Sequence, residues 1–423
     1  MGKNSTININ TPHLRFPGFT GEWKEKTLGE VGVFVRGLSY NKGEVTQDRA
    51  STLVLRSNNI IQDGAVDCKN GLQFVTKEPS PEQILQKGDI VICLSNGSSN
   101  LVGKSASYEG DYAGIATVGA FCGIYRSTAP ITKYLVQTLA YKKSVELIKQ
   151  GGNGALANLY GRDILGLKFN FPSLEEQNII VDCLEAEDRM IAAQDQKVKS
   201  LKAHKTGLMQ QIFPQNGETT PRLRFPGFTG EWEEKKLVDL ARKMNRRNRQ
   251  LEVSRVLTNS ANDGVVDQSE YFDRDIAVKG NTENYHIVEL NDFVYNPRIS
   301  TAAPVGPISI NRIGKGIMSP LYTVFKFHKG YVPFFEYYFQ TTIWHPYLKS
   351  IANFGARFDR MNITSEGFFD MPIYLPSTQA EQQKIASCLS SLDDTIQSET
   401  DKLEALKAHK KGLMQQLFPQ HSK

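Results

Sequence analysis

The sequence predicts two α+β globular domains separated by a pair of long antiparallel coiled-coil helices, arranged as a pseudo-two-fold tandem duplication. The first observation is a repeated arm: TPHLRFPGFTGEW at 11–23 returns as TPRLRFPGFTGEW at 220–232, with twelve of thirteen positions identical. The second is LKAHKTGLMQQIFPQ at 201–215, which returns almost unchanged at 406–420. The third is that the long segments between these repeats are nearly unrelated to each other. Self-similarity at a fixed spacing indicates a duplicated architecture, so we expect an arm, a globular head and a long helix in each half.

The predicted division of the chain follows these repeats. Each head begins after its arm, and each long helix follows a proline that ends a short strand-like run, LKFNF or MPIYL. We expect an amino-terminal arm (1–23), the first head (24–172), the first helix and linker (173–219), the second arm with the second head (220–376), and the second helix and tail (377–423).

Composition is that of an ordinary folded protein. Hydrophobic residues make up 40% of the 423 residues and charged residues 22%, which suits packed cores and excludes wholesale disorder. A net charge of +5 permits nucleic-acid binding but excludes a histone-tail-like polycation. The five cysteines are scattered without zinc-ligand spacing, no stretch is apolar enough to cross a membrane, and the first ten residues lack a signal-peptide core. We therefore expect no metal site, no membrane partner and a cytoplasmic location.

The two long helices are predicted over residues 174–213 and 379–418. At about 1.5 Å per residue, each would be roughly 60 Å long. Both begin with the S/T-x-x-E pattern, at Ser173–Glu176 and Thr378–Glu381. This pattern predicts a capping box, in which the hydroxyl and the glutamate carboxylate reciprocally bind backbone amides.

Apolar residues recur along both helices at intervals of three, four and seven, which is typical of a coiled-coil seam. Lys205 and Lys410 interrupt the seam at equivalent positions. The first helix ends where the second head begins and the second helix begins where that head ends, so the two helices should pair antiparallel. The expected helix-pairing residues are Leu184, Ile191, Val198, Leu201, Leu208, Leu389, Ile396, Leu403, Leu406 and Leu413.

Both heads combine strand-like and helix-like segments. Apolar runs broken by Gly, Asn and Ser predict strands within STLVLRS, GDIVICLSNG and GAFCGIYR in the first head, and within NDFVYNPR and LYTVFKF in the second. Helical stretches are expected near 133–149 and 333–351. A faint common plan relates 88–92 (GDIVI) to 291–295 (NDFVY), and GNGA at 152–155 to NFGA at 353–356.

No segment carries a convincing catalytic pattern. Residues 98–105 (SSNLVGKS) resemble a phosphate-binding P-loop, but Ser98 stands where the first glycine is required and no helix start follows. The triplet Asn296–Arg298 resembles part of an amino-methyltransferase motif without its second proline and aromatic residue. No histidine is paired with a plausible nucleophile, and the repeat equivalents His204 and His409 are interpreted as exposed residues. We therefore expect a protein that is not itself an enzyme.

Basic and amide side chains suggest a different role. Arginines crowd the start of the second head between asparagines and a glutamine, a combination that suits phosphate neutralisation and recognition of base edges. A charge run is more often a solvated face, but few acids interrupt this one. The candidate DNA-binding residues are Arg56, Ser57, Asn58, Asn96, Ser98, Asn100, Lys104, Arg246, Arg247, Arg249, Arg298, Arg312 and Arg357.

The whole layout resembles the specificity subunit of type I restriction–modification systems. The resemblance is carried by the paired LRFPGFTGEW arms, LRSNNI at 55–60, the PSLEEQ and PSTQAEQ helix starts, and the twin KGLMQQLFPQ-like ends. It implies that each head is a target-recognition domain reading one half of an asymmetric bipartite DNA site. It also implies that the helices set the spacing and dock two methyltransferase subunits that methylate adenine, while restriction (translocase) subunits join to direct cleavage. S-adenosylmethionine, and ATP with Mg, would then bind the partner subunits, with no cofactor in this chain.

Two other classes of function stay open at this point. One is a methyltransferase or nuclease acting alone, against which the missing catalytic motifs count. The other is a coiled-coil scaffold with two protein-binding heads, which matching helices and divergent heads would also fit. Salt-sensitive binding to double-stranded DNA separates the scaffold from the DNA reader.

Overall fold

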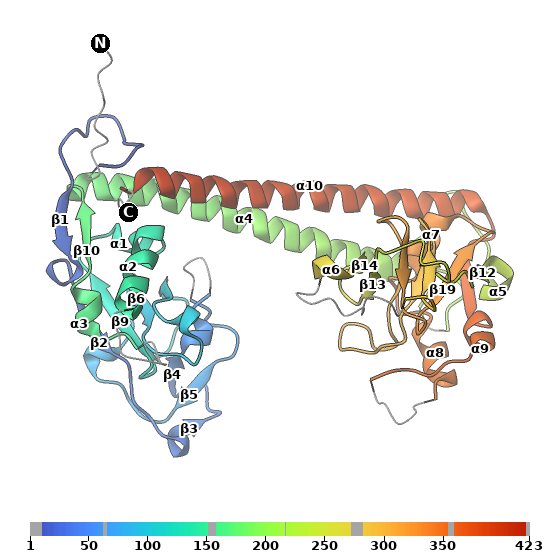
Figure 1. The fold of residues 1–423 in the computed structure, drawn as a ribbon, viewed down its shortest axis with the longest axis horizontal. Coiled ribbons are helices and arrows are strands. Elements are labelled where there is room, and N and C mark those ends of the chain that lie inside the picture. The colour runs from blue at the N-terminus through green and yellow to red at the C-terminus, as the bar shows by residue number, and fades with distance from the viewer. Residues whose placement is uncertain are drawn as a thin grey trace, which may run out of the picture. The chain divides into compact units, whose positions relative to one another are not determined.

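The structure is a computed structural model that describes residues 11–61, 66–150, 158–215, 217–271, 282–353 and 359–419. It divides into two compact units, Met1–Asp195 with Asp401–Lys423, and Gln196–Thr400. The long helices α4 (Leu174–Ile212) and α10 (Gln379–Leu417) each contribute one half to either unit (Figure 1). Each unit therefore contains one head and two helix halves, and the fold class predicted from the sequence is confirmed.

The first head is built on two four-stranded sheets. One has the order β2-β9-β6-β7, and all its pairs are antiparallel. The other has the order β3-β5-β4-β8, in which β4 and β8 run parallel. The bounds are β2 Gly32–Arg36, β3 Val45–Thr46, β4 Thr52–Leu55, β5 Gln73–Val75, β6 Ile90–Cys93, β7 Ser105–Ser107, β8 Ala116–Val118 and β9 Cys122–Ser127. Short 3-10 turns connect them: η1 Leu28–Glu30, η2 Lys42–Glu44, η3 Ser57–Asn59, η4 Pro81–Gln83 and η5 Ser99–Leu101.

Three short helices and a two-stranded ribbon complete the first unit. The helices are α1 Thr132–Leu135, α2 Leu139–Gln150 and α3 Gly161–Leu165. The ribbon pairs β1 (Lys24–Thr27), directly after the arm, with β10 (Lys168–Phe171), directly before α4. It therefore brings the two ends of the head together where the long helix begins.

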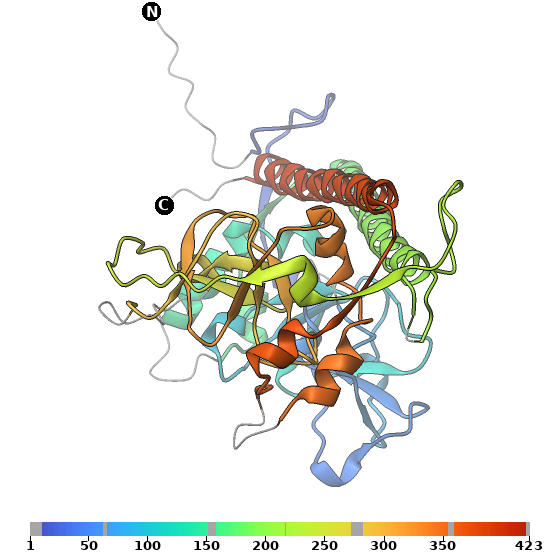
Figure 2. The ribbon, with the colours of Figure 1, turned by 90° about the vertical axis from the view of Figure 1, so that its right-hand side faces the viewer.

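The second head repeats only part of this plan. Its four-stranded sheet has the order β12-β19-β16-β17, and the ribbon β11-β20 again closes the head. In place of the second sheet, the described residues form two antiparallel strand pairs, β13-β14 and β15-β18. The strands are β11 Glu233–Lys236, β12 Ala241–Lys243, β13 Leu257–Ser260, β14 Gly264–Asp267, β15 His286–Val288, β16 Phe293–Tyr295, β17 Ile308–Ile310, β18 Gly316–Met318, β19 Thr323–Phe327 and β20 Pro372–Leu375. The helices are α5 Leu237–Leu240, α6 Gln268–Tyr271, α7 Val332–Tyr338, α8 His345–Ile351 and α9 Ser365–Phe369, of which α7 to α9 are orange in Figure 2.

The predicted kinship of GDIVI and NDFVY is confirmed, because they form the equivalent strands β6 and β16. Gly88 and Asn291 both precede their strand with a positive φ, of 91° and 68°. The buried carboxylate of Asp89 binds Arg126 on β9 at 2.7 Å, and that of Asp292 lies 3.6 Å from Lys326 on β19. The other suggested pair, 152–155 with 353–356, lies outside the described residues except for Asn353.

The strand predictions hold for all five runs, but each predicted helical stretch is broken in two. The first divides into α1 and α2, and the second into α7 and α8. Both breaks contain a Gln-Thr pair, and the threonine hydroxyls of Thr138 and Thr341 donate to the carbonyls of Leu135 and Tyr338 at 2.7 and 2.6 Å. The backbone amides of the same threonines also donate to these two carbonyls, at 3.0 Å each, so two hydrogen bonds close the turn at each break.

The predicted capping boxes are only half correct. The amides of Glu176 and Glu381 do bind the hydroxyls of Ser173 and Thr378, at 3.3 and 3.4 Å. Their carboxylates, however, bind an arginine of the nearby arm instead of turning back to the cap. Charge-assisted bonds from a guanidinium are stronger than a bond from a neutral amide, which explains why the arm takes the glutamate.

Candidate nucleic-acid interface

A bidentate ion pair attaches each arm to its unit. Arg15 donates to both oxygens of Glu176 at 2.7 and 2.8 Å, and Arg224 binds Glu381 at the same two distances. Both glutamates are almost fully buried, with about 1% of their surface exposed. Each arm also binds the last turn of a long helix, because the amide of Leu14 donates to the carbonyl of Gln416 at 3.0 Å and that of Leu223 donates to the carbonyl of Gln211 at 2.9 Å. Equivalent contacts in the two units thus attach the repeated arms.

Within each unit the two helix halves pair antiparallel. In the second unit, Lys197 lies 2.7 Å from Glu399 and Lys205 lies 2.6 Å from Asp393, so partner numbers fall as numbers along α4 rise. The predicted helix-pairing residues are all buried or half-buried. Leu184 and Leu389 are fully enclosed, and both pack into the core of the head in their unit.

The two lysines that interrupt the seam belong to a three-residue cluster, which we call a joint. The first joint is Tyr134, Asp188 and Lys410, and the second is Tyr337, Asp393 and Lys205. In each, the lysine binds the aspartate Oδ1, at 2.5 and 2.6 Å, and the tyrosine hydroxyl donates to Oδ2, at 2.8 and 2.9 Å.

The joints also share their electrostatics. Each lysine Nζ lies 5.2 Å from the centre of the tyrosine ring, a cation–π distance. Burial and the adjacent carboxylate raise the pKa of both Tyr134 and Tyr337, so each hydroxyl keeps its proton and can donate. The tyrosine comes from the head, the aspartate from one long helix and the lysine from the other.

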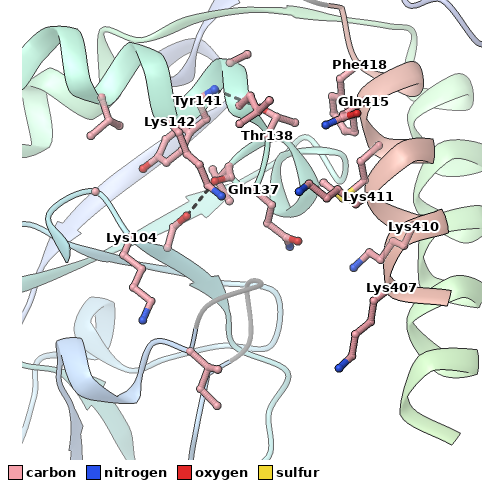
Figure 3. A pocket seen from close by; sticks show the side chains of 18 of the residues that line it. Lys104, Gln137, Thr138, Tyr141, Lys142, Lys407, Lys410, Lys411, Gln415 and Phe418 are labelled. Atoms are coloured by element: carbon pink, nitrogen blue, oxygen red, sulfur yellow. Dashed lines mark hydrogen bonds between the residues drawn. The ribbon is translucent and has the colours of Figure 1, made fainter. Parts of the chain in front are cut away.

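A cavity lies beside each joint, within the same unit. The first, of about 940 Å³, opens between the last turns of α10 and the head segments 100–105 and 136–146. Figure 3 shows Lys407, Lys410 and Lys411 on its α10 side, with Lys104 and Lys142 on the side of the head. The second cavity, of about 480 Å³, is lined by the repeat equivalents Lys202, Lys205, Met209, Gln340 and Thr341, among others.

The candidate DNA-binding residues of the first head gather in two neighbouring turns. The amide of Asn96 donates to the hydroxyl of Ser57 at 2.8 Å, which connects the turn after β4 to the turn after β6. Around this contact, Asn58, Ser98 and Asn100 are exposed. These three side chains are therefore available to a ligand.

Two basic candidates of the first head differ in their surroundings. The guanidinium of Arg56 is half-buried and donates to the carbonyl of Gly71 at 3.0 Å, so part of its bonding capacity supports the fold. Lys104 is half-buried, and its side chain lines the first cavity. The P-loop-like segment that contains it leads into the strand β7 instead of a helix, unlike a nucleotide-binding loop.

Two of the three candidate arginines at the start of the second head already bind other groups of the protein. Arg246 lies 2.6 Å from Glu252 and 3.4 Å from Glu289, and Arg247 donates to the carbonyl of Asn284. Arg249 is exposed, and no ion pair forms with it among the described residues. Of the three, Arg249 therefore has the guanidinium most available to a phosphate.

The remaining second-head candidates also meet acids or fall outside the description. Arg298 lies 3.8 Å from Asp359 and is more than half exposed. Arg312 binds Glu336 and also donates to the side chain of Asn291 at 2.6 Å. Arg357 lies outside the described residues. The motif asparagine Asn296 is buried and uses its amide to bind the carbonyl of Asn259 at 2.9 Å, which is a structural role.

Comparison with known families identifies the architecture. The family model described as "Type I restriction modification DNA specificity domain" matches twice, at residues 20–203 and 229–408. The chain belongs to this family. Each match contains one head and runs into the long helix that follows it, in agreement with the duplication.

Curated members of the family resemble one part of the chain. The type I restriction enzyme StySPI specificity subunit of Salmonella potsdam and the EcoKI specificity subunit of Escherichia coli (strain K12) are each 29% identical over 170 residues. That stretch is 38% of this chain and 35% of each relative, so the chain spans about a third of the length of the curated relatives it matches.

Solved structures of the family share the fold. A type I restriction–modification S subunit from M. genitalium aligns with a TM-score of 0.54 and 12% identity, over 97% of this chain and all of that chain. A structure described as the basis of complex assembly and conformational transition of the type I system aligns at 0.52 and 15%, over 95% of this chain and 98% of that chain.

Neither a metal-binding cluster nor a membrane-spanning helix is found among the residues that the structure describes. Those residues include no group of three or more His, Cys, Asp or Glu side chains that could hold a metal ion. None of the described helices is both long and apolar enough to span a membrane.

Sequence reasoning missed the joints and the arm ion pairs. Their signal was present, because Arg15 and Arg224 are repeat equivalents and Asp188 and Asp393 occupy matching helix positions. The tyrosines were harder to find, since they lie in the diverged heads. Only the short Gln-Thr pair that follows each of them could have pointed to them.

Proposed function

We propose that this protein is the DNA sequence-specificity subunit of a type I restriction–modification complex. Each head would read one half of a bipartite site. The observation that carries the proposal is the double match to the specificity-domain family on a chain whose helices and arms are repeated while its heads differ. Two unlike reading domains on like attachments suit a DNA target with two unlike halves.

Exposed polar side chains support direct contact with DNA. In the first head, Asn58, Ser98 and Asn100 project around the bond between Ser57 and Asn96. Asparagine amides and serine hydroxyls can bind base edges, and both can also bind phosphates. In the second head, the exposed Arg249 would bind a phosphate or a guanine.

The paired helices would set the distance between the half-sites and dock two methyltransferase subunits. Because the helix sequences are repeated, they present equivalent side chains in both units, and two copies of one partner could bind them in the same way. The methyltransferase subunits would methylate adenine with S-adenosylmethionine. Restriction subunits using ATP and Mg would join the same assembly to cleave DNA.

In this proposal the chain itself catalyses no reaction and acts in the cytoplasm. Its contribution would be to hold two recognition surfaces and to bind its partner subunits. The chemistry, with its cofactors, would belong to those partners. Measurable binding of S-adenosylmethionine by the purified chain alone would contradict this division of roles.

A protein-binding scaffold is the second candidate, and one observation favours it. Several second-head arginines are held by carboxylates, including Arg246 by Glu252 and Arg312 by Glu336. This pairing reduces the positive charge that the second head offers to phosphates. A scaffold would bind duplex DNA weakly and without dependence on sequence.

The two candidates are separated by duplex binding measured across a salt series. We expect the affinity of the purified protein for duplex DNA to fall steeply between about 50 and 200 mM salt. Replacing Arg249 with Ala should weaken binding to all sequences and lower the salt slope by about one, as expected for one lost phosphate contact.

Arg222→Ala is the matched control, because Arg222 is an exposed arginine of the second arm that pairs with Glu218 of the linker at 2.9 Å. Its replacement should leave affinity unchanged. Binding that is undetectable, or equally weak on every duplex sequence, would favour the scaffold. Equal loss of affinity in both variants would place the second-head contact elsewhere.

A further inference from the structure

The two joints have the same geometry although the heads that supply their tyrosines have diverged. In both, the lysine takes Oδ1 of the aspartate and the tyrosine hydroxyl takes Oδ2, with matching distances that differ by 0.1 Å (2.5 and 2.6 Å, 2.8 and 2.9 Å). The lysine-to-ring distance is 5.2 Å in both. The first head has two four-stranded sheets and the described residues of the second head form one, yet the joints agree.

Each joint connects three separate elements through a single carboxylate. In the first, Asp188 of α4 receives Lys410 of α10 on one oxygen and Tyr134 of α1 on the other. A carboxylate that is bound on both oxygens fixes the direction of both donors, because hydrogen bonds weaken steeply away from linear geometry. Apolar contacts between a head and a helix lack this directionality.

Burial of the lysine and the tyrosine strengthens the directional hydrogen bonds of each joint. Only 13% of the Lys410 side chain and 17% of the Lys205 side chain are exposed, so neither ammonium can exchange its aspartate freely for water. Both tyrosine rings are buried, at 0% and 7% exposure, and hold the hydroxyl in place from the side of the head. Packing alone would be satisfied by phenylalanine, so the hydroxyls need a further explanation.

We propose that the two joints are positioning residues that fix the direction of each head on its helix pair, and thereby the spacing between half-sites that the protein accepts. This inference rests on the proposed function. Within a unit, the joint determines the angle at which the head is held against the helix pair. If the helix length sets the coarse distance between half-sites, the joints set how narrowly one spacing is preferred over its neighbours.

The test uses the full chain in complex with its methyltransferase subunits. The substrate is a plasmid library in which the two half-sites are separated by every gap from two base pairs shorter to two longer than the natural one. The variant is Tyr134→Phe with Tyr337→Phe, which removes two hydroxyl oxygens and keeps both rings. Tyr160→Phe is the matched control, because Tyr160 is an exposed tyrosine of the first head.

We expect the wild-type complex and the control to methylate one spacing. The double variant should methylate neighbouring spacings with discrimination reduced by about tenfold, the size expected when a hydrogen bond to a charged group is lost. The bases required within each half-site should not change. A role limited to stability would lower methylation at all spacings equally, and that result would overturn the inference.

A second variant keeps the test decisive if the first is poorly folded. Asp188→Asn with Asp393→Asn retains the shape and one acceptor oxygen but removes the charge, and it should also broaden the accepted spacing. Unchanged discrimination in a folded variant of either kind rejects the positioning role. Failure of the proposed function looks different, because the wild-type complex itself would then methylate no split site.

Discussion

The two heads are attached to the long helices in the same way but have different hydrophobic cores. The first has two sheets and a largely aliphatic core, with Ile90, Ile92, Leu94 and Val102 among its buried residues. The described residues of the second form one four-stranded sheet and a core of aromatic rings, in which the rings of Phe327 and Phe335 stack with centroids 3.9 Å apart. Both are attached to their helices by the same arm ion pair and the same joint. The contacts that attach each head to its helices are therefore repeated, whereas the cores of the two heads differ.

The largest effect should come from breaking the attachment that the two units share. Replacing Arg224 with Ala leaves the buried carboxylate of Glu381 without its counter-ion, which should cost about 3–5 kcal/mol of unfolding free energy in the second unit. Arg15→Ala should cost somewhat less in the first unit, because the indole of Trp23 also donates to Glu176, at 3.4 Å. Urea denaturation of each variant measures the difference.

The matched control for both is Lys235→Ala, since Lys235 and its partner Glu233 are both exposed and lie 2.9 Å apart. An exposed pair of this kind contributes less than about 1 kcal/mol. If Arg15→Ala and Lys235→Ala lowered the unfolding free energy by similar amounts, the arm ion pair would not be what attaches the arm to the first unit.

The next largest effect is a loss of stability at low pH, which should differ between the two heads. The second head buries His286, and burial followed by the charges of Arg247 and Lys243 lowers the pKa of this histidine to about 4. Burial and Lys349 lower that of His345 to about 4 as well. The first head, at residues 24–172, contains no histidine.

The direction of this pH dependence follows from the shifts. In the unfolded chain a histidine takes up its proton near pH 6.5, while in the folded second head it stays neutral until about pH 4. Stability is therefore complete above pH 6.5 and is lost as the pH falls toward 4, by up to about 3 kcal/mol for each histidine. Urea denaturation should be measured at pH 5 and at pH 7, with the unfolding of each unit monitored by its susceptibility to proteolysis. The second unit should lose more unfolding free energy than the first.

Replacing both histidines with Gln should remove this difference between the units. A second unit that remained acid-sensitive in the double variant would assign the effect to other groups.

A smaller effect should follow from exchanging equivalent core residues. Phe293 begins β16 and packs against Phe325 and Phe327, whereas its counterpart Ile90 begins β6 in the aliphatic core. Phe293→Ile should destabilise the second unit by about 1–2 kcal/mol through a partly filled cavity, and Ile90→Phe should cost about 1–3 kcal/mol through overpacking. Thermal denaturation would detect both, and tolerance of both changes would mean that the two cores are interchangeable.

The elements that sequence predicted well are those determined by local pattern. The long helices begin and end within one residue of the predicted bounds, because their seam repeats over many turns. All five predicted strand runs form strands, and the GDIVI and NDFVY segments occupy equivalent positions. The predicted domain boundaries follow element ends, while the compact units divide both helices near their middle. Antiparallel pairing explains that division, since each half-helix packs on the head nearest to it in its unit.

The features that sequence could not supply depend on tertiary contacts. The Glu176 carboxylate binds Arg15 and not its own cap, a choice between two local partners that only the fold decides. Lys410 appeared as an interruption of the seam, yet it is held by Asp188 and Tyr134. Arg246 binds both Glu252, which is close in sequence, and Glu289, and only the fold shows that both carboxylates turn toward it. The choice of DNA-contacting residues stays a prediction for the same reason.

The proposed role, directing methylation to a split DNA site, can be tested on the DNA of the host. Single-molecule methylome sequencing of the host, with and without the gene for this protein, reports every methylated motif. We predict that deletion removes adenine methylation at one non-palindromic motif made of two specific halves separated by unspecified bases. Loss of no such motif, in a host that retains active methyltransferase subunits, would contradict the account.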